Sequence, residues 1–237
     1  MLKIEHLTKK YGEKVAVDDL SLHIAPGEIY GFIGHNGAGK TTTLKSIVGI
    51  LDFNEGNIFI DGLSIKDSPL ECKAKIAYIP DNPDIYDYMT GQKYLNFIAD
   101  VFKVGKAERN ERIKKYADMF ELTQALPDAI SSYSHGMKQK LVVISALIHE
   151  PKLIIMDEPF VGLDPKAAHI LKEIMRDICN KGGAIFFSTH VLEVAERLCD
   201  KVAIIKEGKL IRFGTMDEVK GDESLESVFL ELEADNA

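Results

Sequence analysis

The chain has 237 residues, a mass of 26.4 kDa and a formal net charge of −8, and 46% of its residues are hydrophobic. This composition is that of an ordinary globular protein, which excludes disordered, collagen-like and coiled-coil classes, and the length suffices for one large domain with a subdomain. The negative charge argues against an extensive binding surface for a phosphate backbone, so no nucleic-acid partner is expected.

The N-terminus and the apolar segments bear on localisation. No apolar stretch of the secretory type follows Met1, and residues 141–148 are far fewer than the roughly 20 that a membrane-spanning helix needs. We therefore expect a cytoplasmic protein. The three cysteines are too few and too widely spaced for a disulfide framework or a zinc site, so burial is expected for Cys72, Cys179 and Cys199.

In chain order, the first third alternates strand and helix signals. Strands are expected over 2–9, 20–24, 28–33, 57–60 and 76–79, with a glycine-rich loop and a helix over 40–48 between the third and the fourth. Residues 90–148 differ, because their apolar positions recur at helical spacing with no strand among them. We expect a helical insertion there.

A second α/β stretch follows the insertion. It contains strands over 153–156 and 184–187, a helix over about 165–179, and a hairpin of 202–206 with 210–213. The acidic end, residues 222–237, is expected to form a helix and a frayed terminus. The fold class is therefore α/β.

Residues 34–41, GHNGAGKT, match the phosphate-loop pattern G-x-x-x-x-G-K-[ST], in the required place between a strand and a helix. Glycines let backbone N–H groups turn toward phosphates, and the helix start adds partial positive charge. Lys40 is expected to neutralise β- and γ-phosphate charge, and Thr41 to bind Mg²⁺. The expected nucleotide contacts here are Gly34, Asn36, Gly37, Ala38, Gly39, Lys40, Thr41 and Thr42.

An acidic pair, Asp157 and Glu158, ends the apolar strand 153–156. The carboxyl edge of a parallel sheet is where ligands bind in open α/β folds. We expect Asp157 to hold Mg²⁺ and Glu158 to orient or deprotonate the attacking water. His190 ends the following strand and is expected at the same edge.

The motif set resembles the ATP-binding subunits of ABC transporters, over residues 4 to about 214. Residues 133–139, YSHGMKQ, are similar to that family's signature segment and end 18 residues before Asp157. The phosphate loop, signature, acidic pair, residues 162–165 and His190 occur in the family's order. In that family Ser134 and Gly136 contact the ATP held by another subunit, and Tyr11 corresponds to the aromatic that stacks on adenine.

The resemblance implies a P-loop NTPase core with a mixed sheet, an N-terminal antiparallel β subdomain and an inserted α-helical subdomain. The expected parts are 1–88 and 149–220 for the ATP-binding core, 89–148 for the helical subdomain, and 221–237 for a C-terminal helix and tail. ATP and Mg²⁺ are the implied cofactors. The implied partners are a second ATP-binding subunit, in a homodimer or pseudo-dimer, and integral membrane subunits at the inner face of the cell membrane.

Two positions depart from the family's pattern. Asp81 stands where glutamine is usual, and is expected to approach Mg²⁺ through water. His135 stands where glycine is common, and is either a bystander or an added positive charge at low pH. Residues 81–90 look like the region that receives a helix of the membrane partner, with Tyr86 and Tyr88 as anchors or as internal packing.

Three functions account for some or all of these motifs. Residues 133–141 and the short C-terminal segment resemble exporter ATPases for drugs, peptides or ions more than sugar importers, so a transport ATPase is the leading hypothesis. The alternative is a soluble ABC-type ATPase of DNA repair, chromosome organisation or translation. A small-molecule kinase explains the phosphate loop and Asp157 but leaves the signature and His190 unexplained.

Overall fold

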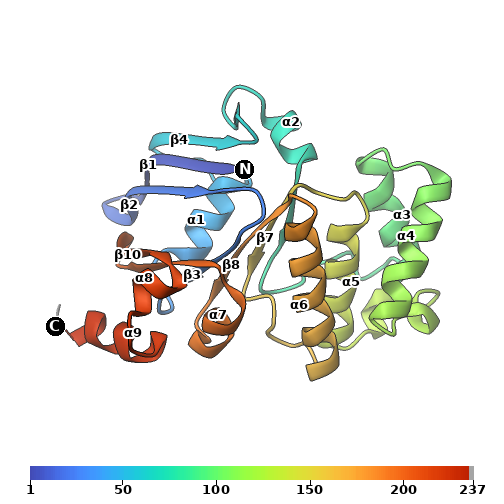
Figure 1. Cartoon of the computed structure of the whole chain (residues 1–237). Coiled ribbons are helices and arrows are strands. Elements are labelled where there is room, and N and C mark those ends of the chain that lie inside the picture. Colours follow the sequence, from blue (N-terminus) through green and yellow to red (C-terminus); the bar gives the residue numbers. More distant parts are fainter. Residues whose placement is uncertain (235–237) are drawn as a thin grey trace.

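The computed structural model describes residues 1–234, which form two sheets and a set of helices (Figure 1). Within these residues the N-terminal sheet has four antiparallel strands in the order β2-β1-β4-β5. They are β1 (Leu2–Tyr11), β2 (Lys14–Ile24), β4 (Glu55–Ile60) and β5 (Leu63–Ser64). Leu2 and Ile4 are buried while Lys3 is exposed, the alternation of a sheet with one face on the core.

The central sheet has six strands among the described residues, in the order β10-β9-β3-β8-β7-β6. The parallel strands are β3 (Ile29–Ile33), β6 (Ile76–Ile79), β7 (Leu153–Asp157), β8 (Ala184–Thr189) and β9 (Lys201–Lys206), and β10 (Lys209–Thr215) joins as an antiparallel edge. Every residue of β3, β7 and β8 is buried, because both faces of the sheet are covered. The expected mixed α/β fold is confirmed.

Two hydrophobic clusters fill the two sides of the central sheet. One contains Phe32 and Ile155, together with Leu44, Cys72 and the N-terminal sheet, and the other contains Ile154 and Phe187 and packs against the helices from residue 91 onward. The helices are α1 (Lys40–Ile47), α2 (Pro69–Ala74), α3 (Gly91–Val101), α4 (Lys106–Met119), α5 (His135–Leu147), α6 (Pro165–Asn180), α7 (Leu192–Leu198), α8 (Met216–Lys220) and α9 (Leu225–Ala234). Figure 1 shows α3 and α4 at the end of the molecule opposite β1 and β2.

Some elements differ from the expectations. β2 begins at Lys14 rather than at residue 20, and the short helices α2, α7 and α8 were not predicted because five to seven residues are too few to show a helical period. The acidic end forms α9, and the expected frayed terminus, 235–237, lies outside the described residues. The three cysteines are free and buried, as expected.

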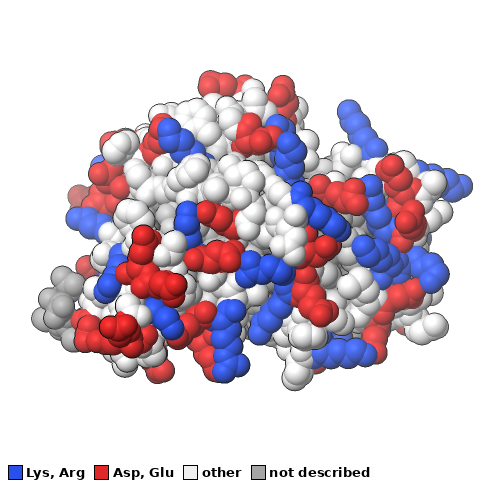
Figure 2. Space-filling model, viewed as in Figure 1, with Lys and Arg blue, Asp and Glu red and all other residues white. Residues whose placement is uncertain are grey.

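Charged residues of both signs are interspersed on the face that Figure 2 shows, and acidic side chains gather around the C-terminal helices. In the part of the chain that the structure describes, no helix has the length and apolar character needed to cross a bilayer.

Candidate nucleotide-binding site

The phosphate loop leaves the buried strand β3 and enters α1 at the carboxyl edge of the central sheet. Gly39 precedes α1 and offers no side chain to cap it, so the first N–H groups of the helix remain for an anion. Gly39 has φ +111°, and a Cβ there would lie 2.6 Å from the Ala16 carbonyl oxygen. Only glycine fits both conditions at this position.

Lys40 lies inside the loop that precedes it. Its side chain is only 6% exposed, and its Nζ donates to the carbonyl oxygens of Gly34, at 2.5 Å, and His35, at 3.2 Å. Burial lowers the pKa of Lys40, and the negative charges of Glu158 and Asp157 partly oppose that shift. The ammonium is therefore held within the cradle before any ligand arrives.

Asp157 is buried at the end of β7 and is fixed from two sides. Thr41 Oγ1 donates to Asp157 Oδ2 at 2.6 Å, and the Ser188 hydroxyl donates to the other carboxylate oxygen. Ser188 also accepts from the Glu158 N–H at 3.1 Å. No role was predicted for Ser188 from the sequence, although its position at the end of the strand beside β7 could have indicated one.

Glu158 and His190 meet at this edge as expected from their strands. His190 Nδ1 lies 2.9 Å from Glu158 Oε1, an ion-pair distance when His190 is protonated, although the angle is not that of a hydrogen bond. Lys40 Nζ is 3.9 Å from the same oxygen. Glu158 has φ +47°, a strained conformation for this residue type, which aims its carboxylate at the lysine and the histidine.

Lys40, Thr41, Asp157 and Glu158 line a cavity of about 270 Å³, whereas the expected site residues Gly34, Ala38 and His190 are not among the residues that line it. The expected residues that line it are Tyr11, Asn36, Gly37, Gly39, Lys40, Thr41, Thr42, Asp81, Asp157 and Glu158. Lys14 also lines the cavity. It was missed because no strand was predicted at residue 14, whereas in the structure Lys14 pairs with Tyr11 across the β1–β2 turn. The cavity combines cations, helix N–H groups and carboxylates, which suits a nucleotide with its metal.

Comparisons with known proteins decide the family. A family model described as ABC transporter matches residues 17–161. The chain is 33% identical over 242 residues to the ABC-type transporter ATP-binding protein EcsA of Bacillus subtilis (strain 168), across 100% of this chain and 98% of EcsA. The chain belongs to the ABC transporter family.

This ABC ATPase has further relatives of known name and structure. It is 33% identical over 219 residues to the linearmycin resistance ATP-binding protein LnrL of Bacillus subtilis (strain 168), across 92% of this chain and 70% of LnrL. A solved ATP-binding subunit of an ABC transporter superposes with a TM-score of 0.95 at 35% identity, covering 98% of this chain and 99% of that one. The chain is therefore an ATP-binding, ATP-hydrolysing subunit of an ABC transporter.

The signature segment of this ABC ATPase lies at the start of α5. Ser134 is exposed and caps α5, accepting from the Met137 N–H at 3.3 Å. The His135 ring packs against Gly162, and Lys140 Nζ lies 2.6 Å from Asp164 Oδ2. Among the residues that line the nucleotide cavity of the described chain, neither Ser134 nor Gly136 occurs.

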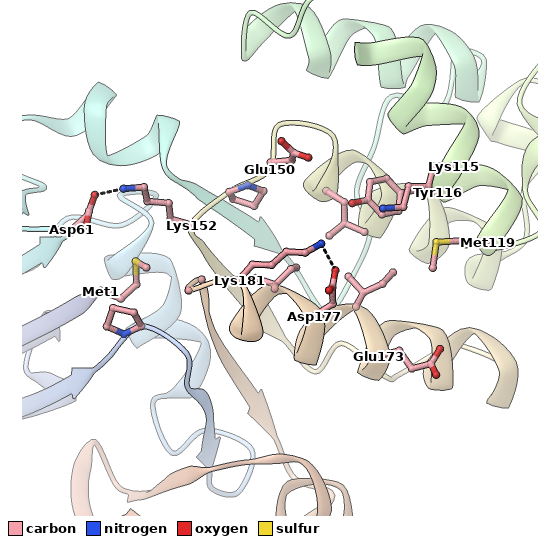
Figure 3. Close-up of a pocket in the computed structure, with 17 residues that line it drawn as sticks. Met1, Asp61, Lys115, Tyr116, Met119, Glu150, Lys152, Glu173, Asp177 and Lys181 are labelled. Atoms are coloured by element: carbon pink, nitrogen blue, oxygen red, sulfur yellow. Dashed lines mark hydrogen bonds and ion pairs between the residues drawn. The ribbon is translucent and has the colours of Figure 1, made fainter. Parts of the chain in front are cut away.

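A larger hollow of this ABC ATPase, about 720 Å³, lies elsewhere. Figure 3 shows it between α4, which contributes Tyr116 and Met119, and α6, which contributes Glu173 and Asp177. Its lining includes Lys152 and Gly183, which precede β7 and β8, so it opens at the amino edge of the sheet. No phosphate-binding motif contributes to it, and the chemistry identifies the smaller cavity as the nucleotide site.

Proposed function

We propose that this subunit powers export through a head-to-tail dimer of ATP-binding subunits, in which Ser134 and Gly136 of one subunit complete the nucleotide site of the other. The observation that carries this proposal is their position: both are at an exposed helix start and outside the cavity formed by their own chain. A hydroxyl, a glycine backbone and a helix N-terminus suit an anionic γ-phosphate. A second subunit can bring them there.

The oxygen donors at the cavity fit Mg²⁺. Thr41 and Asp157 present a hydroxyl and a carboxylate 2.6 Å apart, and Asp81 lines the same cavity, which leaves other positions for phosphate and water as this ion prefers. When bound, Mg²⁺ supplies positive charge that stabilises the transferring phosphoryl group.

Four further residues have proposed roles in nucleotide binding and hydrolysis. Lys40 neutralises phosphate charge, and Tyr11, 48% exposed at the cavity, offers a ring for the adenine to stack on. Glu158 orients and deprotonates the attacking water. His190, 2.9 Å from Glu158, fixes that carboxylate and stays near the γ-phosphate.

A groove of about 380 Å³ beside β6 is the proposed dock for a helix of the membrane subunit. Its apolar lining includes Ile85, Ile98 and Phe102, from the loop after β6 and from α3. Tyr88, 80% exposed, packs its ring 5.7 Å from that of Tyr86, so exposed aromatic side chains lie close to the groove. Exposed aromatics beside an apolar groove are typical anchors for a partner.

Export is favoured by the relative LnrL, which is named for resistance to linearmycin. A transporter that confers resistance has reason to move the compound outward. The proposed location is therefore the cytoplasmic face of the cell membrane, where ATP is supplied and the membrane subunits present their docking helices.

The substitution Glu158→Gln tests the dimer and the catalytic role together. We expect ATP affinity within about threefold of wild type and turnover lower by about 10²- to 10³-fold, the scale of a general base. Light scattering with Mg-ATP should then report twice the mass of one chain. Lys40→Ala is the matched control, since it should lose ATP binding and stay monomeric. A Glu158→Gln chain that binds Mg-ATP and remains monomeric would contradict the dimer proposal.

A further inference from the structure

A buried hydroxyl lies on the strand next to the acidic pair. The hydroxyl oxygen of Tyr78, on β6, is buried and has no hydrogen-bond partner among the described residues. A buried hydroxyl without a partner destabilises the folded chain, because it has lost its hydrogen bonds to water. Phenylalanine would fill the same volume without that cost, so the hydroxyl needs another explanation.

The strand register points to the neighbour that the hydroxyl serves. Tyr78 pairs with Ile155 of the parallel strand β7, and Asp157 stands two residues further along β7. Side chains alternate along a strand, so Ile155 and Asp157 project from the same face as Tyr78. A diagonal neighbour two residues away on an adjacent strand is within reach of an aromatic side chain.

Electrostatics agree with this placement. Burial raises the pKa of the Tyr78 hydroxyl well above its ordinary value, and the negative charges of Asp157 and Asp81 raise it further. The group therefore stays protonated and able to donate at any pH at which the enzyme works. Asp157 and Asp81, the two charged groups near this hydroxyl, both belong to the proposed metal site.

We propose that Tyr78 is a positioning residue for the metal carboxylates, its hydroxyl donating to Asp157 through one ordered water. Asp157 already accepts from Thr41 and Ser188, and each carboxylate oxygen has a further lone pair to offer. A third donor fixes the orientation of the carboxylate that holds Mg²⁺. Outer-shell hydrogen bonds of this kind tune metal affinity.

Tyr78 is also one of the residues that line the groove described above. If the groove is the docking site proposed above, one residue lies both at the partner's helix and beside Asp157. A partner helix seated there would contact the residue whose hydroxyl orients Asp157.

The test compares Tyr78→Phe with Tyr94→Phe. Tyr94 lines the same groove, but its hydroxyl lies beside Ser145 rather than the carboxylates, so Tyr94→Phe is a matched control for loss of a tyrosine hydroxyl at a groove residue. Binding of a fluorescent ATP analogue is measured in EDTA and across a Mg²⁺ titration, together with thermal unfolding. For Tyr78→Phe we expect unchanged affinity in EDTA. The Mg²⁺ concentration that gives half of the gain in nucleotide affinity should rise about tenfold, the scale on which outer-shell partners tune metal affinity.

The outcomes separate this proposal from the previous one. An unchanged Mg²⁺ titration for Tyr78→Phe, or an equal shift for Tyr94→Phe, overturns the role of Tyr78 and leaves the dimer mechanism untouched. If the nucleotide affinity of the wild-type chain does not change with Mg²⁺ concentration, the proposed metal site is overturned, and the role of Tyr78 with it. A shift confined to Tyr78→Phe, without a lower unfolding temperature, supports positioning over a general packing effect.

Discussion

Three glycines of the phosphate loop allow backbone strain and steric overlap to be measured separately by alanine substitution. Gly37 has φ +85° with no atom within 4 Å of an added Cβ, so Gly37→Ala introduces backbone strain alone. At Gly34 the φ is ordinary, but the added Cβ overlaps the Ile205 carbonyl oxygen, so Gly34→Ala introduces a clash alone. Gly39 combines φ +111° with a Cβ 2.6 Å from the Ala16 carbonyl oxygen.

The magnitudes follow from these local geometries. A left-handed conformation costs an L-residue about 1–2 kcal/mol, overpacking costs about 1–3 kcal/mol, and replacing glycine returns about 0.4–1 kcal/mol through the unfolded chain. The expected loss of unfolding free energy is therefore about 1 kcal/mol for Gly37→Ala, about 1–2 kcal/mol for Gly34→Ala, and about 2–4 kcal/mol for Gly39→Ala.

Thermal unfolding without nucleotide measures the series. At this chain length about 1 kcal/mol corresponds to roughly 2–4 °C, so the midpoint should fall least for Gly37→Ala and most for Gly39→Ala. All three variants should also bind ATP more weakly, which an affinity titration checks. If Gly37→Ala destabilised the chain as much as Gly39→Ala, close approach of the loop to β2 would not be the reason for glycine at position 39.

Two further predictions concern a departure from the family's pattern and a surface ion pair. His135→Gly should leave hydrolysis at neutral pH within tenfold of wild type in steady-state assays, since the ring lies against Gly162 and His135 is not among the residues that line the nucleotide cavity. A larger loss would give His135 a direct role. Hydrogen bonds from Lys75 and Lys152 lower the pKa of Asp61 to about 2, so its stabilising charge is present above about pH 4 and is lost as pH falls toward 2. Asp61→Asn should lower the unfolding midpoint at pH 7 by no more than about 2–4 °C, because a partly exposed pair contributes less than about 1 kcal/mol. The difference from wild type should shrink as pH falls below 4 and disappear as pH falls through 2. A difference at pH 2 as large as that at pH 7 would refute the assignment.

The sequence located most of the site because its motifs are local. The spacing of Gly34, Gly39 and Lys40 specifies a loop whose conformation depends on neighbouring residues alone. Asp157, Glu158 and His190 were placed correctly by a rule about where parallel strands end. The start of the second strand was mislocated, since residues 14–19, KVAVDD, hold three consecutive apolar residues and then two aspartates, which is not an alternating pattern. Pairing with β1 decides the extent of this strand.

By itself, then, the sequence determined the fold class, the loop and the carboxylates, because periodicity and motif spacing are properties of a chain read in order. Only the tertiary structure decided which distant groups meet: Ser188 on Asp157, Lys14 at the cavity, His135 on Gly162, and the Tyr78 hydroxyl buried without a partner beside the acidic edge. Those contacts depend on strand register and on helix placement over the sheet. Both are set by the packing of the whole core, which no local pattern encodes.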